Sequence, residues 1–248
     1  MENLQLGRFL ARGKFGKVYL GTFSNKKVAV KVILKKKLVK HQINYLEEIE
    51  ILKMIDHHYV IKFYEWLESK NNIYHIMEYI SNGDLFSKIS RGKIDENKSL
   101  KYVKQIAEGL SYLHENFIMH RDIKSENILL DLDDNIKITD FGHSEKFTKE
   151  QKFYEVAGTI FYLAPEIING KGYDCRIDIW SLGVLYFELV TGESPFTGKE
   201  ETDILKAILV GNYILPTFIS EKTKFQISLI LYINPEYRAS LSTILNFV

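Results

Sequence analysis

Near the start of the chain, β-branched and aromatic residues alternate with polar residues and are separated by turn formers, as in short strands. This pattern predicts five strands, at residues 6–10, 17–22, 27–34, 59–67 and 72–79. Between the third and fourth strands, residues 42–55 place apolar side chains at helical spacing, with acidic side chains on the other face. The first part of the chain is therefore expected to be an antiparallel sheet interrupted by one helix.

After Gly83 the pattern changes to long helical periodicities, which predict helices at residues 95–116, 177–191, 202–210 and 221–233. The change coincides with a turn-forming cluster at residues 81–84. We therefore expect an α+β fold in which one domain has two lobes. The small lobe, residues 1–77, holds the sheet and its helix, the hinge is residues 78–83, and the larger, mostly helical lobe is residues 84–248.

Composition narrows the class of protein. Charged residues nearly cancel, to a formal net charge of +1, and Pro and Gly are sparse, as in a soluble globular enzyme. Cys175 is the single cysteine, residues 1–10 lack a signal-peptide pattern, and no apolar run reaches the ~20 residues of a membrane span. We expect an intracellular protein that contacts neither membrane nor nucleic acid directly. The basic run at residues 35–40 is interpreted as a solvated stretch before a helix.

The candidate chemistry is concentrated in one short stretch. Residues 120–127 read HRDIKSEN, and Asp140-Phe141-Gly142 follows thirteen residues after Asn127. Asp122 is suited to orient an acceptor hydroxyl, and Asn127 and Asp140 offer the oxygen atoms that Mg²⁺ prefers. Because a transferring phosphoryl group gains most from positioning and charge neutralisation, this combination predicts phosphoryl transfer from a nucleotide.

A second candidate segment precedes it. Residues 10–18 read LARGKFGKV, in which glycines between two strands let backbone N–H groups approach phosphates. On its own this segment fits a simple hairpin turn equally well. Lys31 ends the apolar triplet of the next strand and needs a carboxylate partner. Glu48 on the following helix is the first candidate, with Glu47 and Glu50 as competitors.

In order and spacing, these motifs resemble those of eukaryotic protein kinases, from Leu10 to Arg238. The resemblance implies ATP and Mg²⁺ as cofactors. It implies that Gly13 and Gly16 cover the phosphates and that Lys31, paired with Glu48, binds the α- and β-phosphates. It further implies that Asp122 is the catalytic base, that Lys124 binds the γ-phosphate, and that Asn127 and Asp140 bind Mg²⁺. It also implies an adenine pocket lined by Leu10, Val18, Ala29 and Leu129, with Met77 at its rear and backbone groups of Glu78 and Ile80 bonding the base.

The resemblance also implies structural roles. Glu166, at the end of the activation segment (residues 140–166), is expected to pair with Arg238, and Asp178 is expected to brace the catalytic loop (residues 120–127). His120 is expected to pack in the core and not to act as a base. His57, His58 and His143 lack metal-ligand companions at a useful spacing.

Two features indicate the acceptor and the subfamily. Lys124, together with Gly158-Thr159 ahead of Ala164-Pro165-Glu166, resembles serine/threonine kinases. The strings at residues 13–20, 48–51, 140–144 and 180–189 are most similar to Aurora kinases, and other basophilic kinases share several of them. Glu126 and Glu188 match carboxylates that hold a substrate arginine near the acceptor, which predicts basic peptides; ordinary surface acidity is the alternative.

Three residues depart from the usual kinase pattern. Ala11 replaces the first glycine of the phosphate loop, so weaker nucleotide binding is expected. Ser125 replaces a common proline, and we expect little effect from it. Glu155 stands where Aurora kinases carry an activating phosphothreonine that pairs with the arginine of the HRD motif, here Arg121. Either its fixed carboxylate replaces part of that switch, or it is an ordinary exposed loop glutamate.

The resemblance to Aurora kinases implies a role in mitotic chromosome segregation and the spindle checkpoint. With Val248 ending the sequence soon after the last motif, we expect a monomeric catalytic subunit that an inner-centromere-type protein activates and places, in the nucleus or cytoplasm and at the spindle or centromere. A non-catalytic kinase-fold binding module is the main alternative, and it conflicts with the presence of Lys31, Asp122, Asn127 and Asp140. A P-loop hydrolase is excluded because the glycine turn leads into a strand before Lys31 arrives.

Overall fold

The structure, a computed structural model, describes residues 3–13, 16–41 and 45–248. Lys14 and Phe15 of the predicted phosphate loop, and residues 42–44 of the first predicted helix, lie outside the described residues.

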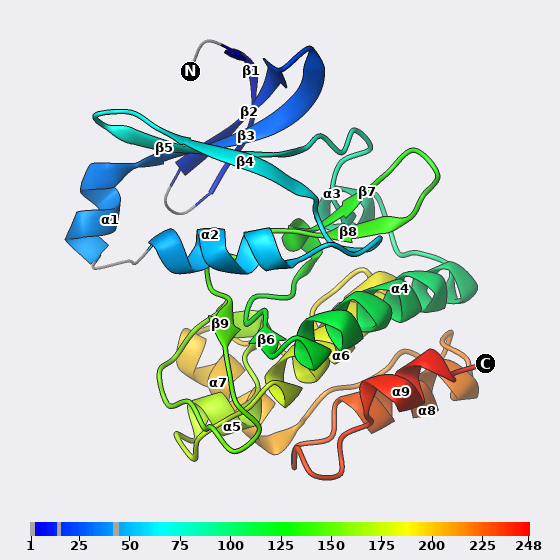
Figure 1. Cartoon of the computed structure of the whole chain (residues 1–248). Coiled ribbons are helices and arrows are strands. Elements are labelled where there is room, and N and C mark those ends of the chain that lie inside the picture. The colour runs from blue at the N-terminus through cyan, green and yellow to red at the C-terminus, as the bar shows by residue number, and fades with distance from the viewer. Residues whose placement is uncertain (1–2, 14–15, 42–44) are drawn as a thin grey trace.

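A five-stranded antiparallel sheet forms one end of the molecule, and most of the helices gather at the other (Figure 1). Its strands are β1 (Leu4–Arg12), β2 (Gly16–Phe23), β3 (Lys26–Leu34), β4 (Phe63–Glu68) and β5 (Asn72–Glu78), in the order β1-β2-β3-β5-β4. The predicted sheet is confirmed, but its fourth strand begins at Phe63 and not at Tyr59. The chain before Phe63 instead reaches the helical part of the molecule, where Val60 forms a bridge with Ile138.

Two helices follow β3: α1 (Lys35–His41) and α2 (Tyr45–Met54), which lies beneath the sheet in Figure 1. The basic run at residues 35–40 lies in helix α1 itself and not in a stretch ahead of a helix, whereas Lys36 is exposed, as expected for a solvated run. Leu38 is buried in a small cluster with Ile33, Ile49 and Ile73 and so fixes α1 against the sheet. Apolar burial of one side chain outweighs the exposure of its lysine neighbours.

The remainder of the chain is mostly helical. Its helices are α3 (Leu85–Ile89), α4 (Glu96–Glu115), α5 (Pro165–Ile168), α6 (Arg176–Thr191), α7 (Glu201–Val210), α8 (Glu221–Ile230) and α9 (Leu241–Leu245). Short strands β6 (Ile118–Met119), β7 (Ile128–Leu130), β8 (Ile136–Ile138) and β9 (Glu145–Lys146), and the 3₁₀ turns η1 (Ser125–Asn127) and η2 (Ile160–Tyr162), connect them. The helix predicted to reach Ile233 ends at Ile230, because Leu231 leaves the helical conformation.

The core of this part lies around α4 and α6. All but three residues of α6 are buried, and Trp180 stacks on Phe196 with ring centroids 5.6 Å apart. A helix that is apolar on all sides belongs inside a domain, so α6 forms a rigid base for the loops above it. The proposed hinge, residues 78–83, begins at Glu78, the last residue of β5, and continues into the connection to α3. In the described part of the chain, no helix is long and apolar enough to span a membrane.

Candidate functional site

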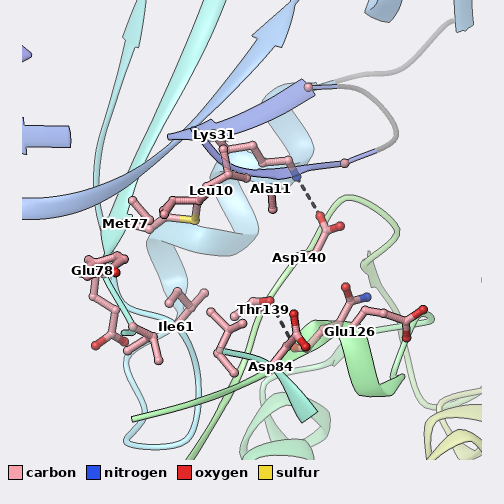
Figure 2. A pocket seen from close by; sticks show the side chains of 18 of the residues that line it. Leu10, Ala11, Lys31, Ile61, Met77, Glu78, Asp84, Glu126, Thr139 and Asp140 are labelled. Atoms are coloured by element: carbon pink, nitrogen blue, oxygen red, sulfur yellow. Dashed lines mark hydrogen bonds and ion pairs between the residues drawn. The ribbon is translucent and has the colours of Figure 1, made fainter. Parts of the chain in front are cut away.

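Lys31 lies on the central strand β3 and reaches two carboxylates. Its Nζ is 2.8 Å from Glu48 Oε1 on α2 and 2.8 Å from Asp140 Oδ1 after β8 (Figure 2 shows the second contact). Of the three glutamates that sequence left open, Glu48 is the one that pairs with Lys31. Burial opposes the charge of Lys31, but the two carboxylates raise its pKa above the usual value. The charge of Lys31 in turn holds the pKa of Asp140 well below its usual range, so both groups are ionised at neutral pH.

Three polar groups surround the carboxylate of Asp122, two from the catalytic loop and one from the activation segment. Asp122 Oδ1 accepts the Thr159 hydroxyl at 2.8 Å, while Oδ2 lies 2.8 Å from Lys124 Nζ and accepts Asn127 Nδ2 at 2.9 Å. Lys124 also donates to Thr159 Oγ1 at 2.7 Å. Burial would raise the pKa of Asp122, but the hydrogen bonds from Lys124 and Thr159 and the lysine charge lower it. Asp122 is therefore a carboxylate that already accepts a hydroxyl proton in a hydrogen bond.

Asp178 braces this loop, as predicted. It is fully buried at the start of α6 and accepts the backbone N–H groups of His120 at 2.9 Å and Arg121 at 2.8 Å. Arg121 has a φ of +65°, a left-handed conformation that a non-glycine residue keeps only when its surroundings enforce it. The buried carboxylate supplies that constraint.

Sequence reasoning missed the second partner of Asp178. His114 Nε2, at the end of α4, lies 2.9 Å from Asp178 Oδ2. Burial would lower the pKa of His114, but its hydrogen bonds to Asp178 and Cys175 and the carboxylate charge raise it to about 9. A lone histidine at the end of a predicted helix gave no signal of a partner 64 residues away.

His120 is a packing residue here. It is fully buried, its Nε2 lies 3.0 Å from the Thr139 carbonyl oxygen, and its ring meets Phe141 edge-on at 5.0 Å. These contacts fix the ring between the catalytic loop and the start of the activation segment. The ring is thus not directed at the hydroxyl that Asp122 accepts.

A pocket of about 480 Å³ lies between the sheet and the helical part (Figure 2). All the residues predicted to bind the nucleotide line it: Leu10, Gly13, Gly16, Val18, Ala29, Lys31, Met77, Glu78, Ile80 and Leu129. Asn127 and Asp140 also line it, whereas Asp122 and Lys124 do not. The volume fits a nucleotide, with apolar lining residues for the base and Lys31 and Asp140 close together for the phosphates and their cation.

Two predicted nucleotide contacts are refined by the geometry. Gly16 is required by the sheet itself, because a Cβ there would lie 2.2 Å from the Val32 carbonyl oxygen. The N–H of Glu78 already donates to the Lys62 carbonyl oxygen at 2.9 Å, and its side chain lies 3.1 Å from Lys137 Nζ. The carbonyl oxygen of Glu78 is therefore the group that remains for contact with a base.

The donor set fits a magnesium–nucleotide complex. In the described part of the chain, no group of three or more His, Cys, Asp and Glu side chains could hold a metal ion. Asn127 donates through Nδ2 to Asp122, which leaves its Oδ1 as a ligand atom, and Asp140 adds a carboxylate at the same end of the pocket. Mg²⁺ commonly binds to one or two such side chains and completes its shell with phosphate oxygens and water.

Arg121 links the catalytic loop to the activation segment. Its Nη1 lies 2.9 Å from Glu155 Oε1 and its Nη2 lies 2.9 Å from Glu145 Oε2. Tyr173 adds to the cluster, since its hydroxyl donates to the Glu155 carbonyl oxygen at 2.9 Å. The predicted contact between Arg121 and Glu155 is present, and Glu145 is a partner that the sequence did not indicate.

Ser125, for which we expected little effect, takes part in a hydrogen-bond network. It is buried, and its N–H donates to the Tyr162 hydroxyl at 3.3 Å, a bond that proline cannot make. Tyr162 donates to Glu188, and the Ser125 hydroxyl contacts Glu126. The predicted pair of substrate-binding carboxylates is thus connected through Ser125.

Comparisons with known proteins agree with this geometry. A family model described as "Protein kinase domain" matches residues 4–247. An Aurora kinase of Patiria pectinifera is 37% identical over 254 residues, which cover 99% of this chain and 62% of that protein. The probable serine/threonine-protein kinase MARK-A of Dictyostelium discoideum is 37% identical over 243 residues, 96% of this chain and 23% of that protein. CBL-interacting protein kinase 10 of Oryza sativa subsp. japonica is 35% identical over 253 residues, which cover 99% of this chain and 56% of that protein. The chain therefore spans less than two thirds of each of these relatives.

Proposed function

The chain belongs to the protein kinase family, and from that premise we propose that it transfers the γ-phosphoryl group of ATP to serine and threonine hydroxyls of proteins. The observation that carries the proposal is the Thr159 hydroxyl, which donates to Asp122 Oδ1 at 2.8 Å while accepting from Lys124 Nζ at 2.7 Å. A substrate hydroxyl presented to the same two groups would be oriented for attack and placed beside an ammonium.

Each charged group has a task in this reaction. Asp122 is ionised at neutral pH and orients the attacking hydroxyl, accepting its proton late because a loose transition state demands little deprotonation. Lys31, held by Glu48, positions the α- and β-phosphates. Asn127 and Asp140 would hold Mg²⁺, which neutralises charge on the phosphates when bound.

Transfer of labelled γ-phosphate from Mg-ATP to serine and threonine peptides tests this function. Asp140→Asn, which removes the ionised pocket carboxylate, is expected to abolish transfer. Asp133→Asn is the matched control, because Asp133 is exposed in the turn between β7 and β8. Binding of ATP by the wild type without any transfer would favour the non-catalytic binding module instead.

We also propose that the peptide substrate carries arginine near its acceptor residue. Glu126 is an exposed residue of the catalytic loop, on the side of the pocket opposite Met77 in Figure 2. The partly buried Glu188 projects from α6. Two carboxylates connected through Ser125 and Tyr162 suit a planar, permanently charged guanidinium better than an ammonium. Replacement of the peptide arginine by citrulline is expected to raise KM.

An Aurora-like role in chromosome segregation is the narrower proposal. It is supported by the motif strings and by the 37% identity to an Aurora kinase. The equal identity to MARK-A, a probable serine/threonine-protein kinase, supports the alternative that this chain is another kind of serine/threonine kinase. The role includes an inner-centromere-type partner and placement at the spindle or centromere. Stimulation of transfer by a peptide from such a partner, and localisation of the tagged protein in dividing cells, test it. No stimulation and a diffuse distribution through mitosis would contradict it.

A further inference from the structure

A buried hydrogen-bonded chain joins the catalytic loop to helix α6 and takes no part in the transfer chemistry. Ser125 is 2% exposed, its N–H donates to the Tyr162 phenol oxygen at 3.3 Å, and its Oγ lies 3.2 Å from the same oxygen. The Ser125 hydroxyl also donates to Glu126 Oε2 at 3.3 Å, and the phenol donates to Glu188 Oε2. One serine therefore reaches both carboxylates, the first directly and the second through one phenol.

The donors and acceptors of this chain match. The phenol of Tyr162 has one proton and two lone pairs, and its proton goes to Glu188. The lone pairs are thus available to the N–H and the hydroxyl of Ser125. The Ser125 hydroxyl has a single proton and two acceptors within reach, the phenol oxygen and Glu126. A proline at this position would supply neither donor.

The electrostatics show why the two carboxylates need these donors. Burial, followed by the nearby charge of Glu126, raises the pKa of Glu188 to about 7, although the hydrogen bond from Tyr162 lowers it. A phenol that itself accepts hydrogen bonds is a stronger donor to the carboxylate, because linked hydrogen bonds polarise one another. Ser125 thus favours the ionised form of Glu188, which is the form that binds a cation.

We propose that Ser125 is a positioning residue for substrate specificity, which holds Glu126 directly and Glu188 through Tyr162 so that both carboxylates bind one arginine of the peptide. This inference rests on the proposed kinase function and deepens its substrate class. Ser125 itself does not touch the arginine. It acts by keeping the two acidic side chains in place.

The test compares two serine peptides that differ only in arginine or citrulline near the acceptor, and measures the ratio of their kcat/KM values. In Ser125→Ala, which loses only the hydroxyl, this ratio is expected to fall by about fivefold, the effect of losing one hydrogen bond of ordinary net strength. In Ser125→Pro, which also loses the N–H that donates to Tyr162, the ratio is expected to fall further. Ser125→Thr, which keeps both donors, is expected to retain the ratio. Ser181→Ala is the matched control, since the Ser181 hydroxyl donates to the backbone oxygen of Tyr162 at 3.0 Å and not to its phenol.

A double-mutant cycle separates positioning from a general loss of folding. If Ser125 acts through the phenol, Tyr162→Phe lowers the ratio, and the double variant with Ser125→Pro, which removes both donors to the phenol, shows a smaller fall than the two single changes combined. An unchanged ratio in Ser125→Ala, or strictly additive effects, would overturn the proposal. A thermal melt of each variant shows whether the fold is retained.

Peptide binding, measured by fluorescence anisotropy with the same arginine and citrulline peptides, tests the role of Ser125 independently of the proposed kinase function. No transfer to any peptide would contradict the kinase function, while a loss of arginine preference on binding to Ser125→Ala would still support Ser125. Equal binding of the two peptides by the wild type would contradict the arginine site and, with it, the role of Ser125. Transfer that persists in that case leaves the kinase function standing.

Discussion

Glu155 Oε1 lies 2.9 Å from Nη1 of Arg121, so the arginine that precedes Asp122 is tied to the activation segment by a carboxylate of the chain itself. Burial would raise the pKa of Glu155, but the hydrogen bond from Arg121 outweighs it and lowers the pKa. The side chain of Glu155 is 60% exposed to solvent, and the side chain of Arg121 is 9% exposed. Solvent screening therefore limits its strength, and Glu145 shares the same guanidinium.

We propose that Glu155 does part of the work of an activating phosphate, and we predict a partial loss of activity without it. Glu155→Ala is expected to lower kcat/KM for peptide phosphorylation by about three- to tenfold, as for loss of an exposed ion pair that orders a loop. Steady-state peptide assays measure the effect. Glu150→Ala, an exposed glutamate of the same segment, is the matched control. If Glu155→Ala and the control behave alike, Glu155 is an ordinary loop glutamate.

Ala11, on β1, lines the pocket that we propose to bind the nucleotide (Figure 2). Ala11→Gly is expected to lower KM for ATP by about twofold to fivefold, because the backbone can then approach the phosphates more closely. The same change weakens the strand by roughly 0.5–1 kcal/mol. Thr22→Gly, on β2 outside the pocket, is expected to weaken the sheet without improving KM. An unchanged KM in Ala11→Gly would remove Ala11 as a determinant of nucleotide binding.

Glu166 and Arg238 form the predicted ion pair, with N–O distances of 2.8 and 3.0 Å and an arginine side chain that is fully buried. Glu166→Gln leaves a buried guanidinium without its counter-charge, so the free energy of unfolding is expected to fall by about 3–5 kcal/mol. Urea denaturation measures this loss. Glu236→Gln serves as the control, because its partner Arg176 also has Asp174. A loss no greater than that of the control would mean that solvent or rearrangement compensates the arginine.

The features that the sequence predicted best are those determined by residues close together in the chain, such as the start of a helix. The helix expected at residues 95–116 is found at Glu96–Glu115, with Asp95 accepting the N–H groups of Asn97 and Lys98 as its N-cap. An aspartate ahead of an apolar helical repeat indicates the start of a helix to within a few residues. The residues that line the pocket were found by motif resemblance for the same reason, since each motif is short and keeps its spacing.

Contacts between distant segments could not be predicted in this way. Nothing near Ser125 in the sequence identifies Tyr162, 37 residues away, as the acceptor of its N–H. Likewise, the apolar periodicity around Leu38 is too short to predict helix α1, whose position depends on burial against the sheet. Such pairings follow from the packing of α6 and the sheet, which a pattern along the chain does not contain.

The ion pair between His114 and Asp178 makes stability depend on pH. The pKa of His114 is about 9 in the folded protein, above the ~6.5 of a histidine in an unfolded chain. The pair therefore contributes its full stability below about pH 6.5, and this contribution is lost as the pH rises toward 9. His114→Gln is expected to lower the free energy of unfolding by about 2 kcal/mol at pH 6 and by much less at pH 9.5. Urea denaturation at several pH values measures both curves, and His58→Gln, at an exposed histidine that packs on Tyr59, is the matched control. A gap between wild type and His114→Gln that stays constant from pH 6 to pH 9.5 would show that His114 stabilises the catalytic loop by packing alone.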